Sequence, residues 1–319
     1  MVLWGSVEME KVELVIIGAG AAGLAAGIYG ARSGLKTLVL EEKLAGGTTA
    51  DAPVVENYLG FQSIGGRELA QKMVAHCRSV GVEIHELEKA VSLDLKDKKK
   101  VVKTDKVAYE TEAVIIASGT HYRELDVPGE KEFRGRGVSY CGICDGPLFK
   151  NKRVLVVGGG NSAAITALYI AELASEVKLA HRKGVLRAEE ALVRALENRE
   201  NLEILWNTEV KEIVGENVVV KALLYDNRTG ETKELKLDGV FIQVGEDPNS
   251  QLAKKAGVKV DREDYIIVDG RQRTNILGVY AAGDVTNHPV KQIGTAVGQG
   301  ITASLEAYCN IKQPYYYKG

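Results

Sequence analysis

The stretch that decides the fold reads Lys11-Val12-Glu13-Leu14-Val15-Ile16-Ile17-Gly18-Ala19-Gly20-Ala21-Ala22-Gly23. Its apolar first part predicts a short buried strand, and the alanine-rich sequence after the glycines predicts a helix. Gly18 allows a tight bend, Gly20 lets backbone N–H groups approach a pyrophosphate, and Gly23 lets helix and strand pack closely. A glycine string alone is weak evidence, but a strand before it and a helix after it predict a dinucleotide-binding turn.

An acidic residue follows the next predicted strand, residues 37–40. Glu41 stands where a carboxylate accepts hydrogen bonds from the hydroxyls of an adenosine ribose, which implies a ribose without a 2'-phosphate at this first turn. The alternative is an ordinary exposed glutamate at a strand end.

The same plan returns 140 residues later, where a second predicted strand, residues 152–157, runs into Gly158-Gly159-Gly160-Asn161-Ser162-Ala163. The position that corresponds to Glu41 is His181, in the sequence His181-Arg182-Lys183, and Arg187 follows. Charge is therefore reversed at the second turn. Cations would pair with a 2'-phosphate that a carboxylate would repel, which predicts NADP(H) rather than NAD(H) here. A solvated basic face is the alternative.

A pair of cysteines stands just before this second turn, in Cys141-Gly142-Ile143-Cys144-Asp145-Gly146. Two thiols with this spacing can close into a small disulfide ring and exchange electrons as thiolates, and Asp145 offers a nearby proton donor. A zinc site would need four ligands, and Cys77 and Cys309 stand alone in the sequence. The pattern favours redox chemistry, with no metal.

A third block follows a predicted strand at residues 277–282. Gly283-Asp284 comes next, then Lys291-Gln292-Ile293 and a predicted helix to about Tyr308. A helix that begins near Gln292 could point N–H groups at the pyrimidine edge of a flavin.

The composition sets the class of protein. With 319 residues, 45% of them hydrophobic, the chain can bury a large core and suggests two domains. A net charge of -2 and a pI near 6.3 give no sign of a nucleic-acid partner. No signal sequence or membrane span is evident, so we expect a cytoplasmic protein.

Together these segments resemble the low-molecular-weight thioredoxin reductases, which are FAD-dependent pyridine nucleotide-disulfide oxidoreductases. The resemblance covers nearly the whole chain. Besides both glycine turns and the cysteine pair, it includes Val55–Gly60, Ala117–Thr120, Gly135–Tyr140 and Ala281–Asp284.

The resemblance implies an α/β protein with two Rossmann-like dinucleotide-binding domains. An NADPH domain, residues 121–247, carries the CxxC pair and is inserted into a discontinuous FAD domain, residues 1–120 and 248–319, with borders in the turn-rich segments 119–127 and 245–249. The implied FAD contacts are Gly18, Gly20, Ala21, Ala22, Gly23, Glu41, Glu42, Gly47, Thr48, Asn57, Ala117, Ser118, Gly119, Gly283, Asp284, Lys291, Gln292 and Ile293. The implied NADPH contacts are Gly158, Gly160, Asn161, Ser162, Ala163, His181, Arg182, Lys183 and Arg187.

The resemblance also implies the roles of the reacting groups. Cys144 would be the sulfur on the flavin side, Cys141 the interchange thiol that attacks thioredoxin or a glutaredoxin-like disulfide protein, and Asp145 the group that manages the proton. A helix cap is the alternative role for Asp145. The relatives are homodimers. Because the cysteines and the second turn share one domain, we expect that domain to rotate about its two linkers during turnover.

Two departures leave alternatives open. Lys183 stands where the family has a second arginine, and it lacks the bidentate fork of a guanidinium group. Thr48 stands where many relatives have a glutamine. A dithiol oxidase, a disulfide reductase fed by NADH or by a reduced deazaflavin, and a non-enzymatic thiol redox sensor therefore remain alternatives.

Overall fold

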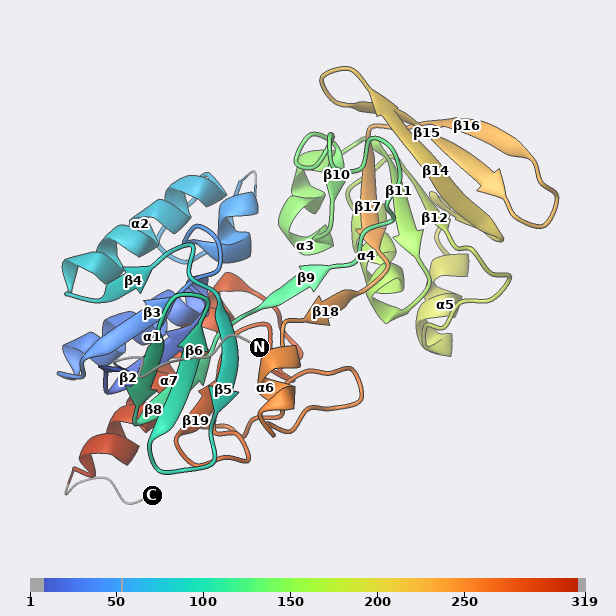
Figure 1. Cartoon of the computed structure of the whole chain (residues 1–319). Coiled ribbons are helices and arrows are strands. Elements are labelled where there is room, and N and C mark those ends of the chain that lie inside the picture. Colours follow the sequence, from blue (N-terminus) through green and yellow to red (C-terminus); the bar gives the residue numbers. More distant parts are fainter. Residues whose placement is uncertain (1–8, 53, 315–319) are drawn as a thin grey trace. The chain divides into compact units, whose positions relative to one another are not determined.

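The computed structural model describes residues 9–52 and 54–314, so the tyrosine-rich segment 315–317 lies outside the described residues. The chain divides into two compact units, Met1–His121 with Asp247–Gly319, and Tyr122–Glu246. Both divisions fall within the turn-rich segments 119–127 and 245–249. Two short paired strands, β9 (Thr120–Tyr122) and β18 (Glu246–Pro248), carry the chain from one unit to the other (Figure 1).

The first unit is built on a five-stranded parallel sheet in the order β19-β8-β2-β3-β4. Its strands are β2 (Leu14–Ile17), β3 (Thr37–Leu40), β4 (Glu83–His85), β8 (Ala113–Ile116) and β19 (Val279–Ala281). A second sheet contains β1 (Glu10–Lys11), β5 (Ala90–Asp94), β6 (Lys100–Thr104) and β7 (Ala108–Thr111). The helices are α1 (Ala21–Arg32), α2 (Gly66–Ser79), α6 (Gln251–Lys255) and α7 (Ile293–Lys312), with a 3-10 turn at Gly47–Asp51.

Alternate residues of the central strands explain why this unit has three layers. Leu14 and Ile16 of β2 pack with the apolar faces of α1, α2 and α7. Val15, between them, packs with Val102 and Tyr109 of the second sheet. A strand that is apolar on both faces must be covered on both, which is why these segments read as continuous apolar runs.

The second unit repeats this plan. Its parallel sheet has the order β10-β17-β11-β12-β13, formed by β10 (Val138–Ser139), β11 (Arg153–Gly158), β12 (Glu176–Ala180), β13 (Leu202–Leu205) and β17 (Gly239–Gln243). One layer contains α4 (Asn161–Ala171) and α5 (Glu190–Glu197), and the other is an antiparallel sheet of β14 (Thr208–Gly215), β15 (Val219–Asp226) and β16 (Thr232–Lys236). The short α3 (Gly142–Asp145) and a 3-10 turn at Gly146–Phe149 precede β11.

The predicted fold class, α/β with two parallel-sheet nucleotide folds, is confirmed. Strand register then positions the site. Ile17 pairs with Leu40 on one side and with Ile116 on the other, so the chain leaves β2, β3 and β8 at the same edge of the sheet. The segments after parallel strands are where open α/β sheets bind ligands.

Candidate active site

The first glycine turn is tightly packed against its neighbours. A Cβ atom at Gly18 would lie 2.3 Å from the carbonyl oxygen of Ala117, and one at Gly23 would lie 1.8 Å from the carbonyl oxygen of Gly18. Gly18 also has a φ of +105°, which favours glycine. No side chain caps α1 at Gly20, so the first N–H groups of this helix remain available to a phosphate. The turn therefore fits a pyrophosphate.

The Glu41 carboxylate borders this turn. Its Oε2 accepts a hydrogen bond from the Ala19 N–H at 2.8 Å, and its Oε1 accepts one from the Lys43 N–H at 2.9 Å. These bonds hold the acid beside the glycines with lone pairs left for ribose hydroxyls. Glu42, in contrast, is exposed and forms a surface ion pair with Lys89 at 2.9 Å.

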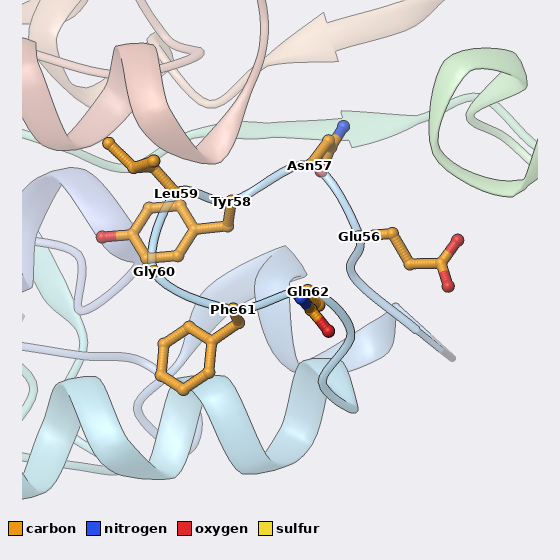
Figure 2. Close-up of a pocket in the computed structure, with 7 residues that line it drawn as sticks. All are labelled: Glu56, Asn57, Tyr58, Leu59, Gly60, Phe61 and Gln62. Atoms are coloured by element: carbon orange, nitrogen blue, oxygen red, sulfur yellow. The ribbon is translucent and has the colours of Figure 1, made fainter.

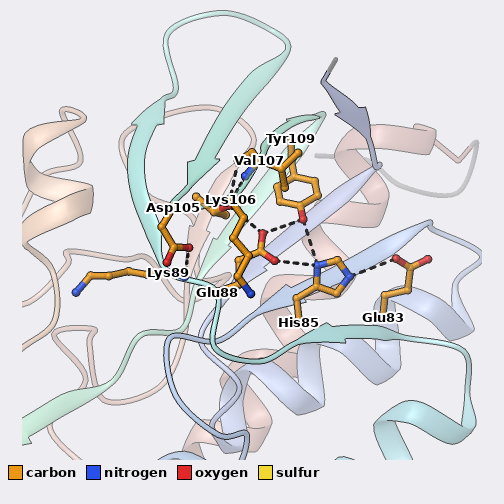
Figure 3. Close-up of polar contacts among 9 residues, drawn as sticks. Glu83, His85, Glu88, Lys89, Asp105, Lys106, Val107 and Tyr109 are labelled. Carbon is orange, nitrogen blue, oxygen red and sulfur yellow. Dashed lines mark hydrogen bonds and ion pairs between the residues drawn. The ribbon is translucent and has the colours of Figure 1, made fainter. Parts of the chain in front are cut away.

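A buried polar network supports the strand end that carries Glu41 (Figure 3). The Glu41 N–H donates to the His85 carbonyl, and the Glu88 N–H donates to the Glu41 carbonyl, both at 2.9 Å. Glu88 is 5% exposed, and its Oε1 accepts from the Tyr109 hydroxyl and from Thr104 Oγ1, each at 2.9 Å. Burial and this hydrogen bond to Glu88 raise the pKa of Tyr109. The network fixes the position of Glu41 from behind.

Asn57 and Gln292, two predicted flavin contacts, are brought together by the fold. Asn57 Nδ2 donates to Gln292 Oε1 at 3.1 Å. Gln292 also forms a reciprocal capping box with Thr295 at the start of α7. Asn57 lies in loop 56–62, which borders an open hollow of about 480 Å³. In Figure 2 the rings of Tyr58 and Phe61 lie on one side of this loop and the Glu56 carboxylate on the other.

The segment around Asp284 is held by its neighbours. The Gly283 N–H donates to Gln299 Oε1 at 2.7 Å. Lys291 Nζ donates to the carbonyl oxygens of Asp284 and Thr286 at 2.8 and 2.6 Å, and it stands 4.1 Å from the centre of the Tyr265 ring. Lys291 thus shapes the backbone of this segment.

The second glycine turn is supported by a histidine. A Cβ atom at Gly159 would lie 2.1 Å from Cε1 of His181, so only glycine fits above the imidazole ring. At Gly160 a Cβ atom would meet nothing within 4 Å, and no side chain caps α4 there. Space and free N–H groups therefore meet at the start of α4, which fits a second pyrophosphate.

His181 does not lie among the exposed cations, although the sequence grouped it with them. Its side chain is 6% exposed, and burial lowers its pKa, with Arg187, Arg182 and Lys183 lowering it further. A neutral imidazole beneath the turn supports the backbone rather than pairing with a phosphate. The three cations are exposed, and none of them forms an ion pair with another residue of 9–52 or 54–314.

The cysteine pair forms a disulfide, Cys141–Cys144, at α3. The Cys144 N–H donates to Cys141 Sγ at 3.2 Å. Asp145 is buried beside them, and its Oδ2 accepts from Ser139 Oγ at 2.6 Å. Burial raises the pKa of Asp145, and the Ser139 hydrogen bond only partly opposes this. A carboxyl group with a raised pKa next to a redox disulfide can hold a proton for transfer.

The remaining predicted contacts differ in exposure and partners. Ala21, Ala22, Ala117, Ala163 and Gly283 are buried, Gly119 has a φ of +65°, Gly47 one of +57°, Ile293 opens α7, and Thr48 and Ser162 are exposed. Ser118 is tied to Asn249 by two hydrogen bonds of 2.8 Å, and Asn161 bonds reciprocally with Glu189. Ser139 and Gln299 were not predicted, because only the tertiary contacts of a serine or a glutamine distinguish it from other polar residues.

Two absences hold for the described part of the chain. Residues 9–52 and 54–314 contain no group of three His, Cys, Asp or Glu side chains that could hold a metal ion. Within the same ranges, no helix combines the length and the apolar character that a membrane crossing requires.

Comparisons with known proteins agree with this geometry. The chain matches the family model for pyridine nucleotide-disulphide oxidoreductases over residues 12–300. It is 44% identical over 298 residues to a thioredoxin reductase of Bacillus subtilis, covering 92% of this chain and 93% of the relative. It is 40% identical over 300 residues to a 34.2 kDa protein in the rubredoxin operon of Clostridium pasteurianum, covering 94% and 97%.

The crystal structure of thioredoxin reductase from Streptococcus pyogenes superposes with a TM-score of 0.91 at 37% identity, covering 96% of this chain and 100% of that one. Glycine turns, disulfide and whole-length similarity lead to one conclusion. The chain belongs to the pyridine nucleotide-disulphide oxidoreductase family.

Proposed function

We propose that this protein is a thioredoxin reductase that passes electrons from NADPH, by way of FAD and the Cys141–Cys144 disulfide, to thioredoxin or a thioredoxin-like protein. The observation that carries the proposal is the redox disulfide with a buried acid beside it, in a unit that has its own nucleotide turn. When bound, FAD and NADPH would supply the hydride chemistry that connects a nicotinamide to a disulfide.

FAD would be held by the first unit, Met1–His121 with Asp247–Gly319. Its pyrophosphate would lie at the Gly18–Gly23 turn, with the adenosine ribose at Glu41. Asn57 and Gln292, joined by their hydrogen bond, would lie at the isoalloxazine ring system, and Asp284, oriented by Lys291, would contact the same cofactor. The uncapped start of α1 supports this placement.

NADPH would be held by the second unit at the start of α4. The pyrophosphate would face Gly160, where the structure leaves open space. Arg182, Lys183 and Arg187 would pair with the 2'-phosphate, since each has no carboxylate partner among the described residues. His181 would act through the backbone that it supports rather than by direct charge pairing.

The protein's own residues would carry out thiol exchange. After reduction of the disulfide, Cys141 as a thiolate would attack one sulfur of the partner's disulfide, and the other sulfur would leave with the electron pair. Asp145 would give that leaving sulfur its proton. Cys144 would then displace the partner from Cys141 and restore the original disulfide, so two electrons reach the partner in each cycle.

A single experiment tests the proposal. The purified protein should show the visible absorption of a bound flavin, NADPH should bleach it faster than NADH, and thioredoxin should be reduced in steady state. Reduction by NADH alone would favour another donor, and bleaching without turnover of any thioredoxin-like protein would favour a redox sensor. A colourless protein that cannot be reconstituted with FAD would refute the proposal.

A further inference from the structure

We infer that Ser139 is the positioning residue of the proton donor: it holds one carboxyl oxygen of Asp145 and so leaves the other, Oδ1, to transfer the proton. The inference rests on the proposed function and adds to it a residue that neither donates electrons nor contacts a cofactor.

The geometry around Ser139 is closed on both sides. Ser139 lies on β10 and is 5% exposed. Its hydroxyl accepts a hydrogen bond from the Cys141 N–H at 3.1 Å and donates to Asp145 Oδ2 at 2.6 Å. One hydroxyl group thus connects the backbone of the first cysteine to the acid.

The two oxygens of Asp145 are therefore unequal. Oδ2 is engaged with Ser139, whereas Oδ1 is buried and has no hydrogen-bond partner among the described residues. A buried polar atom without a partner costs free energy, so such an atom calls for an explanation. We assign it to the proton: Oδ1 carries the hydrogen of the neutral acid until a sulfur arrives to take it.

The electron count of the step is simple. Attack by Cys141 forms one sulfur–sulfur bond and breaks another, and the leaving sulfur keeps the electron pair of the broken bond. The proton moves from Asp145 Oδ1 to that sulfur, which leaves a thiol and a carboxylate. The new negative charge is then stabilised by the hydrogen bond that Ser139 donates to Oδ2.

Two opposing effects act on the acid. Burial favours the neutral acid and raises its pKa, while the hydroxyl hydrogen bond favours the carboxylate and lowers it. The titratable groups beside Asp145 on its own element are the thiols of Cys141 and Cys144, and Tyr169 of α4 packs on the next residue, Gly146. Among the described residues no charged side chain contributes to this pKa.

The test compares Ser139→Ala and Ser139→Thr with the wild-type holoenzyme. Aspartate labelled with ¹³C at the carboxyl carbon reports the pKa of Asp145 in the oxidised protein, and the signal is assigned by its loss in Asp145→Asn. The pH profile of thioredoxin reduction is measured beside the NADPH-driven reduction of ferricyanide, which does not need the cysteines.

We expect Ser139→Ala to raise the pKa of Asp145 and to move the alkaline limb of the thioredoxin profile to higher pH. Its kcat should fall by about tenfold, because a freely rotating carboxyl group loses part of the advantage of a positioned acid. Ferricyanide reduction should stay at the wild-type rate. Ser139→Thr, which keeps the hydroxyl, should restore both the pKa and the profile.

An unchanged Asp145 pKa and an unchanged pH profile in Ser139→Ala would overturn the inference. If Ser139→Ala does not fold, Ser139→Gly removes the same hydroxyl and is read in the same way. Failure of the proposed function is distinguishable, since the wild-type protein would then reduce no thioredoxin, while the carboxyl titration would still show whether Ser139 controls Asp145.

Discussion

Asn57 Nδ2 and Gln292 Oε1 lie 3.1 Å apart although their residues are 235 positions apart in the chain. Asn57 comes from a loop between two strands, and Gln292 caps the last helix. Their hydrogen bond joins the first and last parts of the chain where we propose the flavin ring system to lie. Folding of the first unit must therefore precede formation of a complete flavin site.

Removing one partner of this bond should weaken flavin binding. For Asn57→Ala we expect FAD to dissociate about fivefold more readily, because a lost hydrogen bond costs about 1 kcal/mol. Fluorescence of released FAD measures the dissociation constant. Gln62→Ala, an exposed amide in the same loop, is the matched control and should bind FAD like the wild type. Equal losses in both variants would mean that the loop acts only as a cover.

The cysteines should divide the reaction into two halves. Cys141→Ser and Cys144→Ser should each abolish thioredoxin reduction, because the disulfide cannot form, while bleaching of the flavin by NADPH in a stopped-flow instrument should survive. Cys309→Ser, at a free cysteine away from the disulfide, should keep both activities. Loss of flavin bleaching together with thioredoxin reduction would contradict this division of labour.

The exposed cations should determine the choice of nicotinamide donor. Arg182→Ala should raise the KM for NADPH by about tenfold or more and leave the KM for NADH unchanged, since only NADPH carries the 2'-phosphate. Lys183→Arg should strengthen the preference for NADPH, because a guanidinium group can bind the phosphate through two hydrogen bonds. Steady-state kinetics with both donors measures the effect.

The control for the cation variants is Arg194→Ala on α5, where the arginine pairs with Glu190. It should leave the ratio of the two KM values unchanged. A parallel rise of KM for NADPH and NADH in Arg182→Ala would show that the arginine supports the fold rather than the 2'-phosphate.

The buried Glu88 should stabilise the first unit. In Glu88→Ala the Tyr109 and Thr104 hydroxyls lose their common acceptor, and we expect the free energy of unfolding to fall by about 2–4 kcal/mol. Urea unfolding of the apoprotein measures the change. Glu83→Ala removes an exposed carboxylate 3.8 Å from His85 and should cost less than about 0.5 kcal/mol. Similar costs for both variants would exclude a special role for the buried acid.

Cys77 should contribute to the alkaline limit of stability. Burial raises the pKa of this thiol from 9.0 to about 12, so the folded state favours the protonated form. The stabilisation is complete below pH 9, where the unfolded thiol is also protonated, and it is lost as pH rises from 9 to 12. In Cys77→Ala the fall in the free energy of unfolding over this range should be shallower, as urea titrations can show.

The same burial predicts chemical inertness. At pH 8 native Cys77 should resist iodoacetamide, because the thiolate is the reacting species. Peptide mass spectrometry of the alkylated protein identifies the labelled cysteines. Rapid labelling of Cys77 in the folded protein would show that the α2 face opens to solvent.

Much of the fold could be predicted from local patterns. The strand at residues 37–40 has its predicted bounds, and the helix predicted from near Gln292 to Tyr308 forms as Ile293–Lys312. The strand expected at 277–282 is shorter, Val279–Ala281, because only these residues pair with β8. Strand ends depend on the partner strand, which a local pattern does not contain.

The sequence by itself determined the two glycine turns, the cysteine pair and the reversal of charge between Glu41 and the cations near His181, since each is a local pattern with a direct chemical meaning. Tertiary structure alone decided that His181 is buried beneath Gly159 and that Ser139 holds Asp145. It likewise decided that Asn57 meets Gln292. Burial and hydrogen bonding between distant residues arise only when the layers pack, so no spacing along the chain could have shown them.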